Sequence, residues 1–109
     1  MSFPHSVAHG VGTVNHDWTI GHFDLYRHGR IVTCSMEIAY LTLATLGGVY
    51  ARVPEGFRPA APLYNAPIAL ADGVNCCVGF ASISTDGYVT IKSNVVRVNQ
   101  VLASLTWVA

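Results

Sequence analysis

Residues 31–40 carry the most regular pattern in the sequence. Two sets of side chains alternate there: Val32, Cys34, Met36, Ile38 and Tyr40 with Ile31, Thr33, Ser35, Glu37 and Ala39. Because successive side chains of an extended strand point to opposite faces, this period of two predicts a strand with its even-numbered side chains in the core. A chain that contains such a segment is expected to build a sheet with one buried face.

Turn-forming residues divide the rest of the chain into short extended segments. We expect strands over residues 13–26, 49–53, 63–71, 75–84, 88–92 and 100–109, with a loop over 93–99. The segments are joined by expected tight turns: a hairpin at Arg27–Arg30 with His28 and Gly29 at positive φ, a type I turn over Val53–Gly56, and turns at Asp72-Gly73 and Asp86-Gly87.

The segment from Leu41 to Pro59 is a corner of the predicted fold. The alternation stops at residues 41–46, and Gly47-Gly48 allows a bend before the next strand. In that strand Val49, Ala51 and Val53 are expected to share one face. Phe57 follows the turn, and its ring is expected to be buried and to hold the corner down. Pro67 lacks an N–H group, so its strand is expected at an edge or a bulge.

About seven or eight short strands without a sustained helical period predict an all-β fold, an antiparallel, jelly-roll-like β-sandwich. Residues 13–109 form this domain, and residues 1–12 form a short N-terminal arm or linker. His5 and His9 would share a helical face if a turn formed after Pro4, and around a threefold axis they could collect a metal ion. Gly10 and Gly12 favour a flexible leader instead.

Charged residues make up only 11% of the chain, against roughly 25% in an ordinary soluble domain, while 51% are hydrophobic. A small domain has a large surface, so much of this surface must be neutral, and we expect copies of the chain to cover it in a homo-oligomer. The six basic residues are scattered, which argues against nucleic acid. The apolar run Ile38–Ala51 is too short to span a bilayer, so no membrane insertion is expected. No signal peptide is apparent, which indicates synthesis in a cytoplasm.

The sequence offers little for catalysis or metal binding. His22 and Asp24 share a strand face, but no nucleophile elbow of the form G-x-S-x-G accompanies them. The three cysteines show no zinc-ligand spacing, and at most one of the adjacent pair Cys76 and Cys77 can face the core. We therefore expect a protein that is not an enzyme and uses no cofactor and no metal. A small hydrolase acting on wall polymers is kept as a possibility beside the binding and structural functions considered next.

Two motifs resemble a known family. The run ARVPEGFRP at residues 51–59 and the hairpin STDGYVTI at residues 84–91 resemble small β-sandwich modules of phage and prophage tail proteins, the C-terminal heads of tail fibres and baseplate receptor-binding proteins. The resemblance covers Trp18 to Ala109. It implies a homotrimer at the tail tip of a virion, made in the host cytoplasm, that contacts other tail or baseplate proteins and binds a saccharide of the bacterial cell surface.

Saccharides are bound by aromatic faces together with amides, carboxylates and imidazoles, because hydroxyl groups both donate and accept hydrogen bonds. The residues of these types near strand ends and loops give the candidate ligand-binding set: Trp18, His22, Tyr64, Asn65, Asp72, Asn75, Asp86 and Tyr88. The alternative is a purely structural tail or baseplate module in which these residues fill the core and form turns.

Overall fold

The computed structural model describes residues 7–44, 46–93 and 97–109, and within them nine β-strands and no helix. The strands are β1 (Ala8–Val11), β2 (Thr13–Val14), β3 (Trp18–His28), β4 (Ile31–Ala44), β5 (Gly47–Arg52), β6 (Leu63–Ala71), β7 (Cys76–Ile83), β8 (Tyr88–Lys92) and β9 (Val98–Val108). The all-β prediction is confirmed. The expected strand over residues 13–26 is two strands, because the chain turns at residues 15–17.

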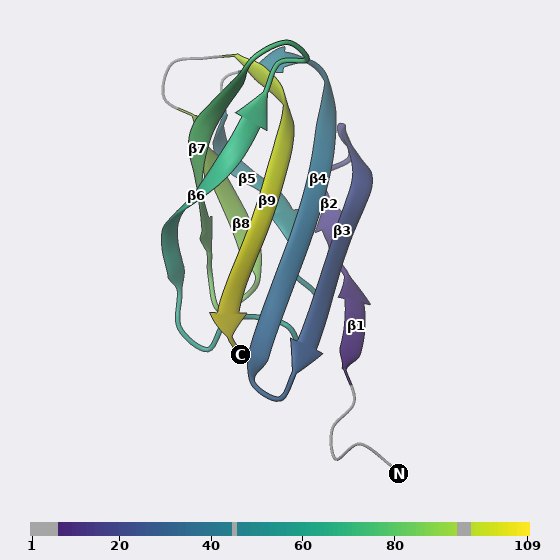
Figure 1. The fold of residues 1–109 in the computed structure, drawn as a ribbon, viewed down its shortest axis with the longest axis vertical. Coiled ribbons are helices and arrows are strands. Elements are labelled where there is room, and N and C mark those ends of the chain that lie inside the picture. The colour runs from purple at the N-terminus through teal and green to yellow at the C-terminus, as the bar shows by residue number, and fades with distance from the viewer. Residues whose placement is uncertain (1–6, 45, 94–96) are drawn as a thin grey trace.

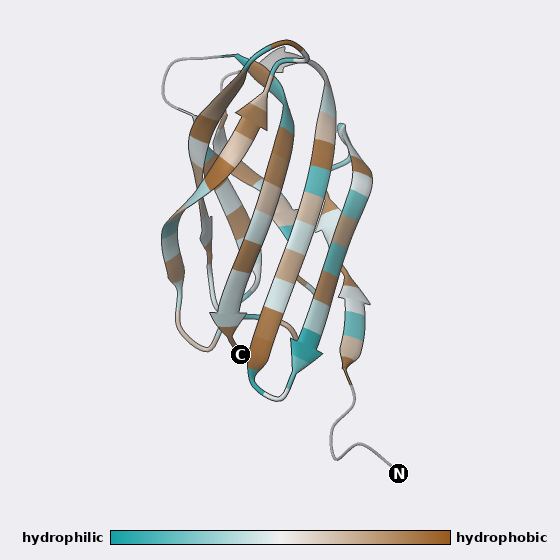
Figure 2. Ribbon diagram, viewed as in Figure 1, coloured by the Kyte–Doolittle hydropathy of each residue, from teal (hydrophilic) through white to brown (hydrophobic). Residues whose placement is uncertain are grey.

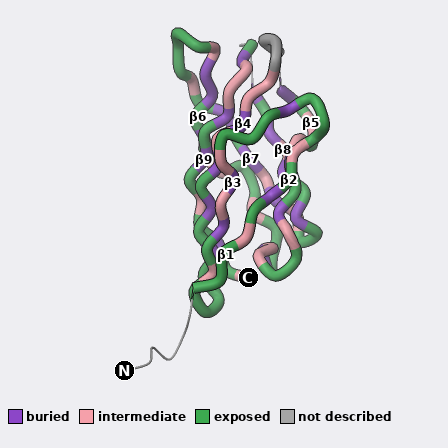
Figure 3. Tube along the Cα trace, turned by 90° about the vertical axis from the view of Figure 1, so that its right-hand side faces the viewer, coloured by how far each residue is buried: buried purple, intermediate pink, exposed green. Residues whose placement is uncertain are grey.

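The strands form one antiparallel sheet in the order β1-β3-β4-β9-β6-β7-β8-β5-β2. Figures 1 and 3 show that this sheet folds back on itself, so that β5 and β8 lie behind β4 and β9. The two end strands, β1 and β2, are separated in sequence only by Gly12, which brings the ends of the sheet together. The sheet is therefore nearly closed around the space between its two sides.

Part of the predicted N-terminal arm belongs to this sheet. Ala8–Val11 pair with Arg27–Asp24 of β3, so His9 is in a strand and does not share a helical face with any neighbour; His5 lies outside the described residues. The backbone N–H of Gly12 donates to the carbonyl of Phe23. A Cβ at Gly12 would lie 2.3 Å from the Phe23 ring, so only glycine lets the chain pass this close as it crosses from β1 to β2.

The core lies between the two sides of the sheet and is built by the predicted alternation. Val32, Cys34, Met36 and Ile38 of β4 are buried, and Tyr40 is half-buried. Hydrophobic and hydrophilic bands alternate along β3, β4 and β9 in Figure 2, and buried and exposed residues alternate in Figure 3. The largest fully buried side chains come from both sides of the sheet: Leu25, Val32, Ile38, Val53, Leu70, Ile83, Val89, Ile91, Val98 and Val101.

Two predicted turns are displaced by one residue. The corner after β5 is closed by a hydrogen bond from the N–H of Phe57 to the carbonyl of Pro54, with Gly56 at φ 92°. Glycine is therefore at the third position, as in a type II turn, and the prediction of a type I turn over Val53–Gly56 is wrong. The Phe57 ring is half-buried, and the Trp107 indole N–H donates to the Phe57 carbonyl at 2.7 Å, which ties the corner to β9.

The β3–β4 hairpin is shifted in the same way. His28 pairs with Ile31, so the turn residues are Gly29 and Arg30, and only Gly29 has a positive φ, 62°. The expected positive φ at His28 is wrong. A single glycine at the first turn position satisfies a type II′ turn, and His28 remains the last residue of β3.

Smaller differences come from the way strands pair. A bulge between Val49 and Ala51 turns Val49 to solvent, while Ala51 and Val53 are buried as predicted. The last strand begins at Val98 rather than residue 100, and residues 94–96 of the predicted loop lie outside the described part. Pro67 lies where β6 pairs with β7 but not with β9, which bonds β6 only at Ala69–Ala71, so its predicted edge position is confirmed.

Candidate functional site

Tyr64 and Tyr88 lie on one shallow cleft on the outer side of β6, β7 and β8. The cleft has a volume of about 220 Å³. Tyr64 is 73% exposed and Tyr88 is 43% exposed, so both rings can be reached from solvent. The lining residues are Pro62, Leu63, Tyr64, Ser82, Ile83, Ser84, Tyr88 and Thr90. Two aromatic residues chosen from the sequence, 24 positions apart, thus meet at one place.

A bulge in β6 accounts for the exposure of Tyr64. Leu63 pairs with Ile83 and Ala66 with Ala81, so β6 has one more residue than β7 over this span. Asn65 takes up the extra length at φ 51°, and among the described non-glycine residues no other has a positive φ. Its backbone N–H donates to Ser82 Oγ at 2.9 Å. Bulges of this kind re-aim side chains, and here the bulge turns Tyr64 outward beside the cleft.

The position of Tyr88 is fixed by hydrogen bonds in its turn and by the side chain of Arg52. Its backbone N–H donates to Ser84 Oγ at 3.1 Å, and its carbonyl accepts from the N–H of Ser84. The Arg52 guanidinium lies 4.4 Å from the centre of the Tyr88 ring and donates from Nε to the carbonyl of Asp86. This cation–π contact fixes the ring without placing Arg52 in the lining of the cleft.

The lining of the cleft has a definite chemistry. It offers two aromatic rings, the hydroxyl groups of Ser82, Ser84 and Thr90, and no charged side chain. The Ser82 and Ser84 hydroxyl oxygens each accept from a backbone N–H, which leaves each O–H to donate outward. A neutral cleft with aromatic walls and hydroxyl groups suits a ligand that has an apolar ring face and an edge of hydroxyls.

Other predicted site residues lie elsewhere. Asp72 and Asn75 are in the β6–β7 turn, roughly 25 Å along β6 from Tyr64 at the usual rise of a strand. Asp72 Oδ1 accepts from the N–H groups of Asn75 at 2.7 Å and Val74 at 2.9 Å. These bonds lower the pKa of the Asp72 carboxyl, and the bond from the backbone of Asn75 has the largest effect. The carboxylate therefore stabilises its own turn. Asp86 lies in the turn before Tyr88, close to the cleft but outside its lining.

Trp18 lies at a different cavity, about 400 Å³ in volume, together with Tyr40 and Tyr50. Trp18 is only 7% exposed, and the rings of both tyrosines pack against its ring. The cavity at Trp18 and the Tyr64–Tyr88 cleft have no lining residue in common. Aromatic residues chosen from the sequence thus lie at both cavities, and the sequence contained no signal that would separate the two groups.

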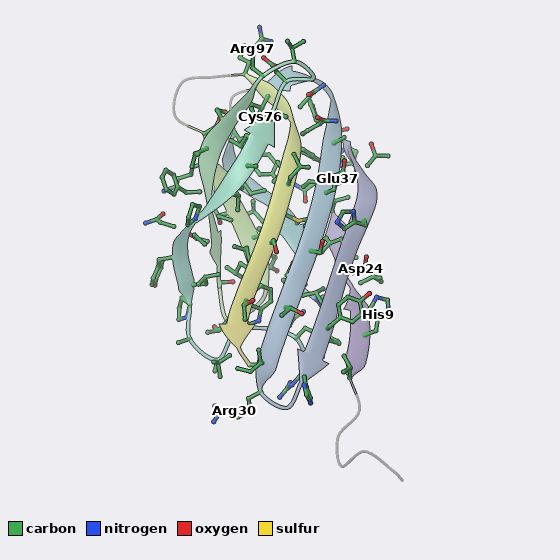
Figure 4. The ribbon with its side chains drawn as sticks, in the orientation of Figure 1. His9, Asp24, Arg30, Glu37, Cys76 and Arg97 are labelled. Carbon is green, nitrogen blue, oxygen red and sulfur yellow. The ribbon has the colours of Figure 1, made fainter. Side chains whose placement is uncertain are left out.

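His22 belongs to a row of polar side chains on the outer face of β3 and β4. Its Nε2 is 2.9 Å from Ser35 Oγ, and its Nδ1 is 3.6 Å from Glu37 Oε2. Nearby, His9 Nε2 is 2.9 Å from Asp24 Oδ1, and Figure 4 shows this pair beside β1 and β3, with Glu37 further along β4. Sequence reasoning missed Ser35 and Glu37 as partners of His22, because only the register of β3 against β4 brings them together.

The Ser35–His22–Glu37 row has the order of groups found in serine hydrolases, but its setting differs from theirs. Ser35 is paired on both sides, with Asp24 of β3 and with Ser104 of β9. The backbone N–H groups around it are therefore engaged in sheet ladders and are not aimed at a substrate carbonyl, where an oxyanion would form. The row is better described as a surface hydrogen-bond network.

Comparison with protein-family models, with curated proteins and with solved structures finds no match. In the part of the chain that the structure describes, no helix is long and apolar enough to cross a membrane. The same residues contain no group of three or more His, Cys, Asp or Glu side chains that could hold a metal ion.

Proposed function

We propose that this chain is a non-enzymatic, carbohydrate-binding head module that acts as a homotrimer at the tail tip of a phage or prophage, where it binds a saccharide of the host cell surface. The observation that carries the proposal is the cleft between Tyr64 and Tyr88. Its rings are exposed, it is neutral, and hydroxyl groups line it. Placement in a tail fibre or baseplate, next to other tail proteins, rests on the resemblance of residues 51–59 and 84–91.

Saccharide binding fits this cleft better than the other ligand classes do. A sugar ring has an apolar face that stacks on aromatic side chains, and its hydroxyls exchange hydrogen bonds with serine and threonine. Single-stranded nucleic acid would also stack on tyrosines, but it needs a basic groove along its phosphates, and no basic residue lines the cleft. The cleft is small, which is consistent with one sugar unit and a weak single site.

Trimer formation would make overall binding strong although each single saccharide site is weak. Three weak sites carried by one particle bind a repetitive polymer far more tightly than one site does. The adjacent strands β9, β6 and β7 contain no Asp, Glu, Lys, Arg or His, and their outer side exposes Val78, Phe80 and Leu102. We propose that this charge-free face is the contact between protomers and that each protomer is a jelly-roll-like β-sandwich. Support for the sandwich is the position of β5 and β8 behind β4 and β9.

A glycan array and a pull-down with purified bacterial wall polysaccharide test the proposal. We expect binding by the wild type, and a loss of about twofold to tenfold per site for Tyr64→Ala or Tyr88→Ala, since an aromatic contact contributes about 0.5–1.5 kcal/mol. Tyr26→Ala is the matched control, because Tyr26 is 45% exposed but stacks on His9 over β1 and β3.

The result also separates the alternative function. If the oligomer is intact and neither the array nor the pull-down gives a signal, the chain is a structural tail or baseplate module whose neutral faces serve assembly alone. If Tyr26→Ala weakens binding as much as Tyr64→Ala does, the saccharide binds elsewhere and the Tyr64–Tyr88 cleft is not the site.

A further inference from the structure

The cavity of about 400 Å³ at Trp18, the aromatic cup, contains three aromatic side chains. Its lining residues are Asn15, His16, Asp17, Trp18, Tyr40, Leu46 and Tyr50. Trp18 is its floor. The ring centre of Tyr40 lies 5.1 Å from that of Trp18 at an interplanar angle of 40°, and the centre of Tyr50 lies 5.3 Å away at 61°. Three aromatic rings that pack against one another therefore form part of the lining.

Hydrogen bonds between backbone segments hold the rings in place. Asn15 donates from its backbone N–H to the carbonyl of Tyr50 at 3.0 Å and from Nδ2 to the carbonyl of Val49 at 2.8 Å. The N–H of Trp18 donates to the carbonyl of Asn15, which fixes the turn between β2 and β3. The N–H of Gly47 donates to Tyr50 Oη at 3.0 Å, so the second wall is fixed at its outer end. A cup built this way needs little rearrangement to bind a ligand.

The charge at the cup is one-sided. Asp17 brings a carboxylate to the rim, where His16 Nε2 lies 3.2 Å from Asp17 Oδ1. Neither lysine nor arginine lines the cup. The faces of the three aromatic rings carry partial negative charge as well. The cup therefore combines apolar walls with a negative potential.

We propose that the aromatic cup binds a quaternary ammonium group, of the kind found in choline and its esters. A positive charge over the faces of tryptophan and tyrosine is stabilised by about 0.5 to 2 kcal/mol, and quaternary ammonium ions are bound in aromatic cages for this reason. The volume falls in the usual range for small-ligand sites, roughly 300–1,000 Å³.

Other ligand classes fit the cup less well. A sugar stacks on one broad, flat aromatic face, whereas the rings of Tyr40 and Tyr50 are inclined to that of Trp18 at 40° and 61°. An anion would meet the Asp17 carboxylate and the negative faces of the rings. A primary ammonium group is strongly hydrated, and it would need several acceptors to replace the water that it loses on entry. A quaternary ammonium group carries its charge on methyl groups, so it binds water more weakly and loses less hydration on entry.

The sharpest test compares two ligands of nearly the same shape, choline and the uncharged 3,3-dimethylbutan-1-ol. Trp18 and Trp107 are the two tryptophans of the chain, so their indole N–H signals can be followed separately by NMR on the intact protein. We expect choline to shift the Trp18 signal with saturation at millimolar concentration and to leave Trp107 unchanged. The neutral ligand should bind about tenfold more weakly, the ratio that a cation–π contribution of about 1.4 kcal/mol gives.

Variants assign the effect to the cup. Tyr40→Leu removes one wall and should weaken choline binding about tenfold, and Asp17→Asn should weaken it a few-fold. Tyr26→Leu controls for loss of an exposed tyrosine elsewhere and should bind choline as well as the wild type does. If Tyr40→Leu does not fold, comparing choline with the neutral ligand on the wild type and on Asp17→Asn still shows whether the cup selects the positive charge.

Equal binding of choline and the neutral ligand would overturn the proposal, because the cup would then be only an apolar cavity. So would an unshifted Trp18 signal at high choline concentration. The proposal does not depend on the saccharide cleft, which lies on other strands: a blank glycan array leaves it standing, and its own failure leaves the cleft untouched.

Discussion

Cys34 shows how the interior of this fold changes the chemistry of one side chain. It is the second of the even-numbered residues of β4 and is almost fully buried in the core. Burial, and to a smaller extent the negative charge of Asp24, raise the pKa of the Cys34 thiol from 9.0 to about 12. The neutral thiol packs as a small apolar group in the core. Cys76 is exposed and Cys77 is half-buried, so at most one of them faces the core, as predicted.

The raised pKa predicts a loss of stability in alkaline solution. Below pH 9 the thiol is protonated in both the folded and the unfolded chain, and its contribution is complete. Between pH 9 and about 12 the unfolded chain loses the proton while the folded chain keeps it, so the free energy of unfolding falls as pH rises. Urea denaturation at about pH 8.5 and 10 should show the wild type losing about 1 kcal/mol more than Cys34→Ala. Equal losses would contradict the buried, protonated thiol.

At the scale of elements, the sequence predicted strands well and their irregularities poorly. The alternation in β4 and the bounds of β6 and β8 follow from local patterns, because one residue in two must face the core. The bulges at Val49 and at Tyr64–Asn65 depend on which strand lies alongside, and nothing in the local pattern reveals this. The turn at Gly56 was displaced because a glycine fits both the fourth position of a type I turn and the third position of a type II turn.

The same limit applies to the candidate site. Tyr64 and Tyr88 were identified by residue type, and their meeting depends on the order β6-β7-β8, which brings two distant segments together. His22 and Trp18 were chosen by the same criterion, yet β3 carries His22 to an outer face and Trp18 to the aromatic cup. Composition can select the side chains of a binding site, but strand order decides which of them share it.

The bulge in β6 makes a testable link between backbone and binding. Asn65→Gly fits φ 51° without strain and should change the free energy of unfolding by less than about 0.5 kcal/mol. Asn65→Val places a β-branched side chain at a positive φ and should cost about 1–2 kcal/mol. Because the bulge aims Tyr64, the valine variant should also bind saccharide more weakly than the glycine variant. Thermal unfolding and the glycan array measure both, and equal behaviour of the two variants would remove the role given to the bulge.

At the scale of the whole molecule, the few charges are distributed unevenly. His9, Asp24 and Glu37 lie on the β1–β3–β4 side of the molecule, and Arg30 and Arg97 lie near opposite ends (Figure 4). The neighbouring strands β9, β6 and β7 contain no acidic, basic or histidine residue. Composition alone predicted that the surface is poor in charge, but it could not show that the neutral part forms one continuous face. That face includes an apolar cleft of about 570 Å³ beside Val78 and Leu102.

If this face joins protomers, one charge placed on it should separate them. Val78 is 65% exposed and lines the apolar cleft, so Val78→Glu would bury a carboxylate without a partner in the contact, at a cost of several kcal/mol. We expect multi-angle light scattering at micromolar concentration to give three times the mass of one chain for the wild type and the mass of one chain for Val78→Glu. Val49→Glu, at an exposed valine on β5, should remain trimeric. Both valines are exposed in the protomer, so neither variant should lower its free energy of unfolding by more than about 0.5 kcal/mol, and the loss of assembly at Val78 alone then locates the contact. A wild type that is monomeric under these conditions would refute the trimer and, with it, the avidity on which weak saccharide binding depends.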